Sequence, residues 1–116
     1  MQESPLFVKV HDLLQWLIPL TLKFPREHRF VVTQQVQQTA FEFQARIFDA
    51  RHGVDLPRSL RLADACMARL RALLRLCADW MLMAPRQLEH VSGRLLEIGK
   101  LLGAWIRATS ENRASA

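Results

Sequence analysis

Residues 88–107 read LEHVSGRLLEIGKLLGAWIR, and this stretch decides the fold class because its large apolar residues recur at alternating steps of three and four. Such spacing places them on one side of an α-helix. The apolar side carries Leu88, Val91, Leu95, Ile98, Leu102 and Trp105. The opposite side carries Arg86, His90, Arg94, Glu97, Lys100 and Arg107. The segment therefore predicts a helix with a core-forming face and a strongly basic outer face.

Similar spacing recurs along the chain and predicts an all-α fold with four helices. The predicted helices cover residues 5–22, 30–52, 58–83 and 85–109. Because the connectors are short, neighbouring helices are expected to be antiparallel, as in an up-down-up-down four-helix bundle. Residues 1–109 are predicted to form one domain, and the small polar residues 110–116 a flexible tail. Gly99 and Gly103 would let another backbone approach the last helix, either inside the bundle or between subunits.

Local signals mark the ends of these helices. Ser4 followed by Pro5 is typical of a helix start, and Gly53 is suited to a helix C-terminus. Pro19 is expected to kink the first helix or to end its regular part near Ile18. The predicted apolar seam of the third helix is Leu62, Cys66, Leu70, Leu73, Cys77 and Trp80.

The charge of the chain favours an anionic partner. Its 116 residues include 16 Lys or Arg against 11 Asp or Glu, which gives a formal charge of +5. Of the 16 basic residues, 13 are Arg, whose guanidinium groups bind phosphate and carboxylate in a two-pronged manner. Nucleic acid and an acidic protein face are both candidates. The alternative is that the charge only keeps the protein in solution.

Cysteine usage and the lack of targeting signals favour the cytoplasm. Cys66 and Cys77 are 11 positions apart on one predicted helix, so they lie about 16 Å apart and cannot pair with each other. They are expected to be buried free thiols in a reducing compartment. The first residues lack the pattern of a signal peptide, and no apolar run is long enough to span a membrane.

The sequence offers no catalytic constellation. GRLLEIGK differs from a phosphate-binding loop, since five residues separate Gly93 from Gly99 and Leu101 replaces the magnesium-binding Ser or Thr. The four histidines lie on different elements, without partners at metal-ligand spacing. We therefore expect a protein that is not an enzyme and has no cofactor, no metal and no small-molecule substrate.

Basic residues instead suggest a binding surface. On the third helix they stand among Ala65, Ala68 and Ala72, with only Asp64 and Asp79 to offset them. The candidate contacts are Arg26, Arg29, Arg58, Arg61, Arg69, Arg71, Arg75, Arg86, Arg94, Lys100 and Arg107. No base-reading motif accompanies them. The three tryptophans Trp16, Trp80 and Trp105 are assigned to apolar faces. Binding is therefore expected to involve mainly the phosphate backbone.

Three stretches resemble a known family. FPREHRF (24–30), LLRLCADWMLM (73–83) and LEHVSGRLLEIGKLLGAWIR (88–107) resemble the accessory variability determinant (Avd) proteins of diversity-generating retroelements. These proteins are related to four-helix proteins encoded in 23S ribosomal RNA intervening sequences. The resemblance implies a ring-like homopentamer and a non-catalytic partner of the element's reverse transcriptase. It also implies contact with RNA or RNA/DNA hybrid during complementary-DNA synthesis.

Some features leave this interpretation open. Lys100, Leu101 and Ala104 depart from the residues commoner in the family, which bears on how closely subunits approach. The physics of the sequence alone permits dimers as readily as pentamers. Two alternatives therefore remain: a structural homo-oligomeric interaction module, and a four-helix protein associated with the ribosome or 23S RNA.

Overall fold

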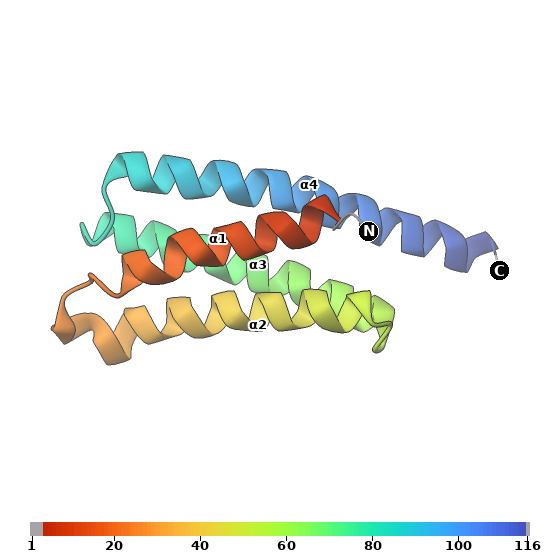
Figure 1. Ribbon diagram of the computed structural model, residues 1–116, viewed down its shortest axis with the longest axis horizontal. Coiled ribbons are helices and arrows are strands. Elements are labelled where there is room, and N and C mark those ends of the chain that lie inside the picture. Colours follow the sequence, from red (N-terminus) through yellow and green to blue (C-terminus); the bar gives the residue numbers. More distant parts are fainter. Residues whose placement is uncertain (1–3, 116) are drawn as a thin grey trace.

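The computed structural model describes residues 4–115, and within this range it contains four α-helices and no strand. The helices are α1 (Pro5–Thr21), α2 (Gln34–Arg51), α3 (Leu56–Asp79) and α4 (Pro85–Ser115). The chain reverses direction at each connection, so that the helices lie along one long axis (Figure 1). The expected all-α four-helix fold is confirmed.

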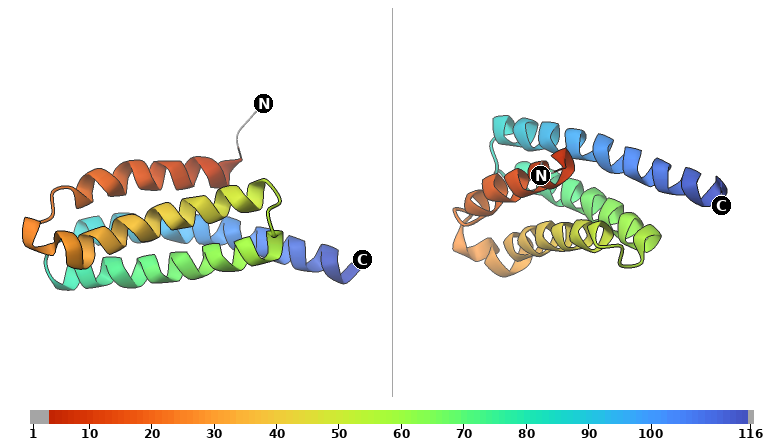
Figure 2. Two further views of the ribbon diagram at one scale, coloured as in Figure 1. Left: turned by 90° about the horizontal axis from the view of Figure 1, so that it is seen from below. Right: turned by 45° about the vertical axis from the view of Figure 1, so that its right-hand side comes forward.

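The connection between α1 and α2 is itself mostly helical. A short 3-10 helix, η1 (Arg26–His28), is followed by a π-helical turn, η2 (Arg29–Thr33), which leads directly into α2. Near the C-terminus, α4 continues six residues beyond its predicted end at residue 109. This C-terminal part of α4 projects past the other three helices in both views of Figure 2.

The predicted effect of Pro19 on α1 is wrong in part. Ser4 and Pro5 occupy the N-cap and first positions as predicted, although the Ser4 side chain makes no capping hydrogen bond. The helix does not end at Ile18 but continues through Pro19 to Thr21, whose hydroxyl donates to the Ile18 carbonyl at 2.7 Å. Pro19 is exposed and close to the helix end, so water can reach the carbonyl that loses its partner there.

Helices α2 and α3 both end in a left-handed residue that closes a Schellman motif. After α2, the amide of Val54 donates to the Asp49 carbonyl at 2.9 Å, and Gly53 has φ +74°. Gly53 thus acts as the C-terminal cap that its position predicted. After α3, the amide of Leu82 donates to the Cys77 carbonyl at 2.8 Å. There the left-handed position is held by Met81, with φ 63°.

The core lies between all four helices and contains mostly Leu, Ile, Val and Phe. Its largest fully buried side chains include Leu13, Leu17, Val36, Phe43, Ile47, Leu60, Leu70, Leu74, Leu95, Ile98 and Leu102. On α3 the predicted seam is wrong at its end, because Trp80 is 46% exposed. Since α3 packs against both α2 and α4, its buried stripe also includes Ala63 and Met67, and Leu73 is only half-buried. Trp80 itself is the residue that follows the last turn of α3.

Candidate nucleic-acid interface

The outer face of α3 presents four exposed arginines, Arg58, Arg61, Arg71 and Arg75. Between them lie exposed alanines, which keep the helix surface low around the guanidinium groups. Within residues 4–113, whose side chains the structure describes, no carboxylate comes within 4.0 Å of these four guanidinium groups. Their positive charge is therefore available to an anionic partner.

Arg71 differs from the others because α4 holds its side chain. Its Nη2 donates to the Leu95 carbonyl at 3.3 Å. Gly99 leaves room for this approach, since an added Cβ there would lie 3.1 Å from the same Nη2 atom. Gly99 thus gives space to the Arg71 and Met67 side chains of α3, where the sequence suggested the approach of a backbone.

Arg69 is turned away from this face toward α2. Its Nη2 donates to Oε2 of Glu42 at 2.6 Å, so a carboxylate balances its charge. The same pair lies beside Cys66, and burial is the main cause that raises the pKa of this thiol. Burial also raises the pKa of Cys77 to about 11. Both cysteines are free and buried, as predicted.

The basic residues on α4 lie in a more mixed environment. Arg94 donates through Nε to Nε2 of His90 at 2.8 Å, an arrangement that requires this ring nitrogen to be unprotonated. Nearby, Lys9 of α1 pairs with Glu97 at 2.7 Å, and this partner lowers the pKa of the Glu97 carboxyl group. Lys100 and Arg107 are exposed. The α4 strip is therefore less uniformly positive than the face of α3.

The remaining predicted residues lie at one end of the bundle. Arg26 and Arg29 belong to the α1–α2 connection, and Arg86 is in the first turn of α4 at the same end (Figure 1). The arrangement therefore separates the eleven predicted residues into the α3 face, the α4 strip and this end, with Arg69 apart.

A family comparison adds to this geometry. A sequence model of a family described as bAvd-like matches residues 6–109. The chain belongs to the bAvd-like family. The match confirms the resemblance to Avd proteins and indicates an accessory role in a diversity-generating retroelement. None of the curated proteins compared with this bAvd-like chain matches it.

The same end of the bAvd-like bundle exposes large apolar residues that sequence reasoning missed. We call this set the apolar end surface; it consists of Leu22, Phe30, Val31, Trp80 and Met81. Phe30 is 79% exposed and Met81 is 89% exposed, while the Trp80 ring lies 6.0 Å from the His28 ring. Sequence reasoning missed Met81 because the predicted helix 58–83 includes it, whereas α3 ends at Asp79. Exposed apolar patches occur at protein–protein, membrane and ligand interfaces.

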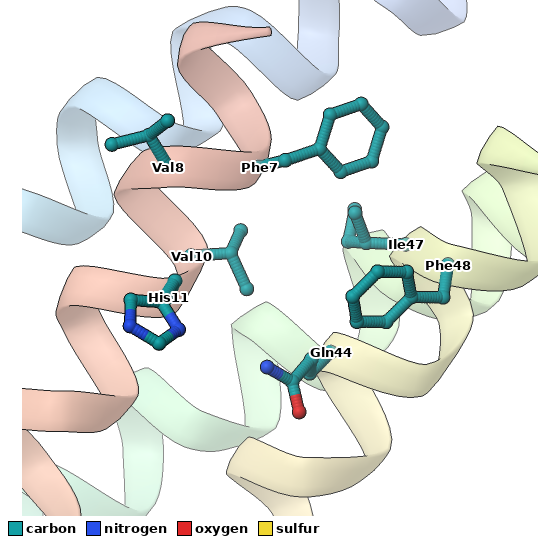
Figure 3. Close-up of a pocket in the computed structure, with 7 residues that line it drawn as sticks. All are labelled: Phe7, Val8, Val10, His11, Gln44, Ile47 and Phe48. Atoms are coloured by element: carbon teal, nitrogen blue, oxygen red, sulfur yellow. The ribbon is translucent and has the colours of Figure 1, made fainter. Parts of the chain in front are cut away.

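A second apolar feature of the bAvd-like chain lies between α1 and α2. The start of α1 is held against α4 by Phe7, whose ring packs edge-on against that of Trp105 with the ring centroids 6.1 Å apart. Between α1 and α2 lies a groove of about 270 Å³ that is lined mainly by apolar side chains, with Gln44 and His11 at its lower edge (Figure 3). Val8 and Phe48 are partly exposed along it.

The described part of this bAvd-like chain shows neither a metal-binding cluster nor a membrane-spanning helix. No three His, Cys, Asp or Glu side chains there lie close enough together to hold a metal ion. None of the described helices combines the length and the apolar character that a bilayer crossing requires.

Proposed function

We propose that this bAvd-like protein is a non-catalytic accessory protein of a diversity-generating retroelement. It binds the element's reverse transcriptase and RNA or RNA/DNA hybrid, and it supports mutagenic complementary-DNA synthesis. The observation that carries the proposal is the α3 face, where four exposed arginines have no carboxylate partner among the described residues. The chain that presents this face belongs to the bAvd-like family. Backbone phosphates are the groups that such a face attracts. Free buried thiols are consistent with action in the cytoplasm.

Reconstitution tests the accessory role directly. The purified full chain is combined with the reverse transcriptase and the template RNA of its own element, and the yield of complementary DNA is measured. We expect synthesis to depend on the chain, and Arg61→Glu to lower the yield. Arg113→Glu is the matched control, because Arg113 is also exposed but lies on the projecting part of α4. Equal yield with and without the chain would refute the accessory role.

Binding of RNA is tested separately from synthesis. Fluorescence anisotropy with a labelled RNA hairpin should show an affinity that falls as salt concentration rises, since phosphate contacts release counterions. Wild-type protein that retains no RNA even at low salt would contradict the nucleic-acid part of the proposal. Retained assembly without RNA binding would favour a structural interaction module instead. Co-purification with 23S RNA fragments in place of the polymerase would favour the ribosome-associated alternative.

Self-association into a ring-like homopentamer is the quaternary part of the proposal. The apolar groove between α1 and α2 supports it, because Val8 and Phe48 are only partly covered in a single protomer. Light scattering should give about 67 kDa, which is five copies of the 13.4 kDa chain. We expect Phe48→Glu to reduce this mass and Val54→Glu, in the loop after α2, to preserve it. A monomeric wild-type protein would refute the ring.

A further inference from the structure

A cleft between α3 and α4 brings the two best-placed arginines to one site. Its volume is about 380 Å³. It is lined by Arg71, Leu74, Arg75, Asp79, Leu88, Ser92 and Leu95. The leucines form apolar walls, while the guanidinium groups and the Ser92 hydroxyl supply hydrogen-bond donors. Two cationic groups against one carboxylate leave the lining with a positive charge.

The Arg71 side chain is positioned before any ligand arrives. Its Nη2 already donates to the Leu95 carbonyl, and its guanidinium group lies over Gly99. A guanidinium group carries five N–H donors, so most of them stay available to a second acceptor. Because α4 already restricts this side chain, less conformational entropy is lost when an anion binds.

Arg75 and Ser92 complete the donor set around the same space. Arg75 lies one helical turn after Arg71, which places their Cβ atoms about 6 Å apart on one side of α3. Ser92 is exposed on α4, which forms the opposite wall of the cleft. Asp79 lies a further turn along α3 from Arg75. Donors from two helices therefore line the same cleft.

We propose that this α3–α4 cleft binds a phosphate group of a nucleic-acid backbone. Arg71 and Arg75 donate to its oxygens from α3, and the Ser92 hydroxyl donates from α4. A tetrahedral phosphate accepts from both walls at once, whereas a planar carboxylate is best matched to a single guanidinium fork. This inference rests on the proposed nucleic-acid binding, and it assigns the contact to one cleft rather than to diffuse positive charge.

Two kinds of variant distinguish binding in the cleft from a general effect of positive charge on RNA binding. Arg71→Ala and Arg75→Ala remove one donor group each, while Arg113→Ala removes one exposed positive charge elsewhere. Gly99→Leu keeps the net charge but fills the space in which the Arg71 guanidinium lies. Gly93→Leu is its matched control, because an added Cβ at Gly93 meets nothing within 4 Å. Circular dichroism checks that each variant is folded, and Gly99→Ala replaces Gly99→Leu if the larger residue prevents folding.

The assay is anisotropy of a labelled RNA hairpin over a range of salt concentrations. We expect Arg71→Ala and Arg75→Ala each to weaken binding about tenfold and to reduce the salt slope by about 1. Gly99→Leu should weaken binding several-fold with an unchanged slope, because the charge remains. Ser92→Ala should cause a smaller loss. Arg113→Ala and Gly93→Leu should bind nearly as wild type does.

Each other outcome has a definite meaning. If wild type binds RNA but Arg71→Ala and Gly99→Leu behave like their controls, the cleft is refuted and the proposed function stands. If wild type binds no RNA at any salt concentration, both are refuted. If labelled polyglutamate binds in place of RNA and depends on Arg71, the cleft recognises a protein carboxylate and the phosphate assignment is wrong.

Discussion

Met81 occupies a backbone position that glycine would hold at lower energy. Its φ of 63° lies in the left-handed region, where it closes the hydrogen-bonded end of α3. A residue with a Cβ in this region costs about 1–2 kcal/mol. Glycine also has more conformational freedom in the unfolded chain, and this reduces the stability gained by the Gly variant by about 0.4–1 kcal/mol. Because the Met81 side chain is 89% exposed, little packing is lost on its removal. Met81→Gly should therefore stabilise the protein by about 0.5–1 kcal/mol.

Urea denaturation followed by circular dichroism measures this change, at one fixed protein concentration because the stability of an associating protein depends on its concentration. Gly53→Ala is the mirror-image control: Gly53 has φ +74° at the end of α2, and this variant should lose about 1 kcal/mol. A Met81→Gly protein that is no more stable than wild type would refute the reasoning. If stability rises while binding to the reverse transcriptase falls, then Met81 is retained for the apolar end surface at the expense of stability.

Three further outcomes follow from burial and charge. The pKa of Cys77 is raised to about 11 against a usual value of 9, so the folded state favours the neutral thiol. The stabilisation from this group is complete below pH 9 and is lost as the pH rises toward 11. Wild type should therefore lose up to about 1.4 kcal/mol per pH unit more than Cys77→Val in this window, as measured by urea denaturation. Phe30→Glu with Met81→Glu should preserve the fold and reduce co-purification with the reverse transcriptase, whereas Val54→Glu at the other end should not; equal retention would exclude the apolar end surface. Phe43→Ala, at a fully buried position, should cost about 3–5 kcal/mol in the unfolding free energy, and a loss below 1 kcal/mol would contradict the described core.

Much of the local structure could be predicted from neighbouring residues. The helix of residues 88–107 follows from its three-four spacing, and the end of α2 follows from Gly53, because both signals act within one or two turns. The predicted end of α1 near Ile18 was wrong because position along the helix matters as well as residue type: Pro19 lies in the last turn, near an exposed C-terminal end, where water can reach the carbonyl that lacks its helical partner.

The candidate site could be predicted only in outline. The arginines of α3 were found because charge and helical position are both read from the sequence. The sequence did not show which of these arginines remain available to a ligand, because Arg69 pairs with Glu42 of another helix and Arg71 is held by α4. The exposure of Trp80 was missed for a similar reason, since it depends on where α3 ends and on what packs beside that end.

Sequence by itself determined that this chain forms four amphipathic helices and that the last two carry basic outer faces, because those properties depend on the spacing of residues along a single helix. Tertiary structure decided which charges are paired, where Gly99 admits a side chain, and where two arginines line a common cleft. The reason is that each of these depends on contacts between residues far apart in the chain, such as Arg71 and Leu95, whose relative placement is set only when the helices pack.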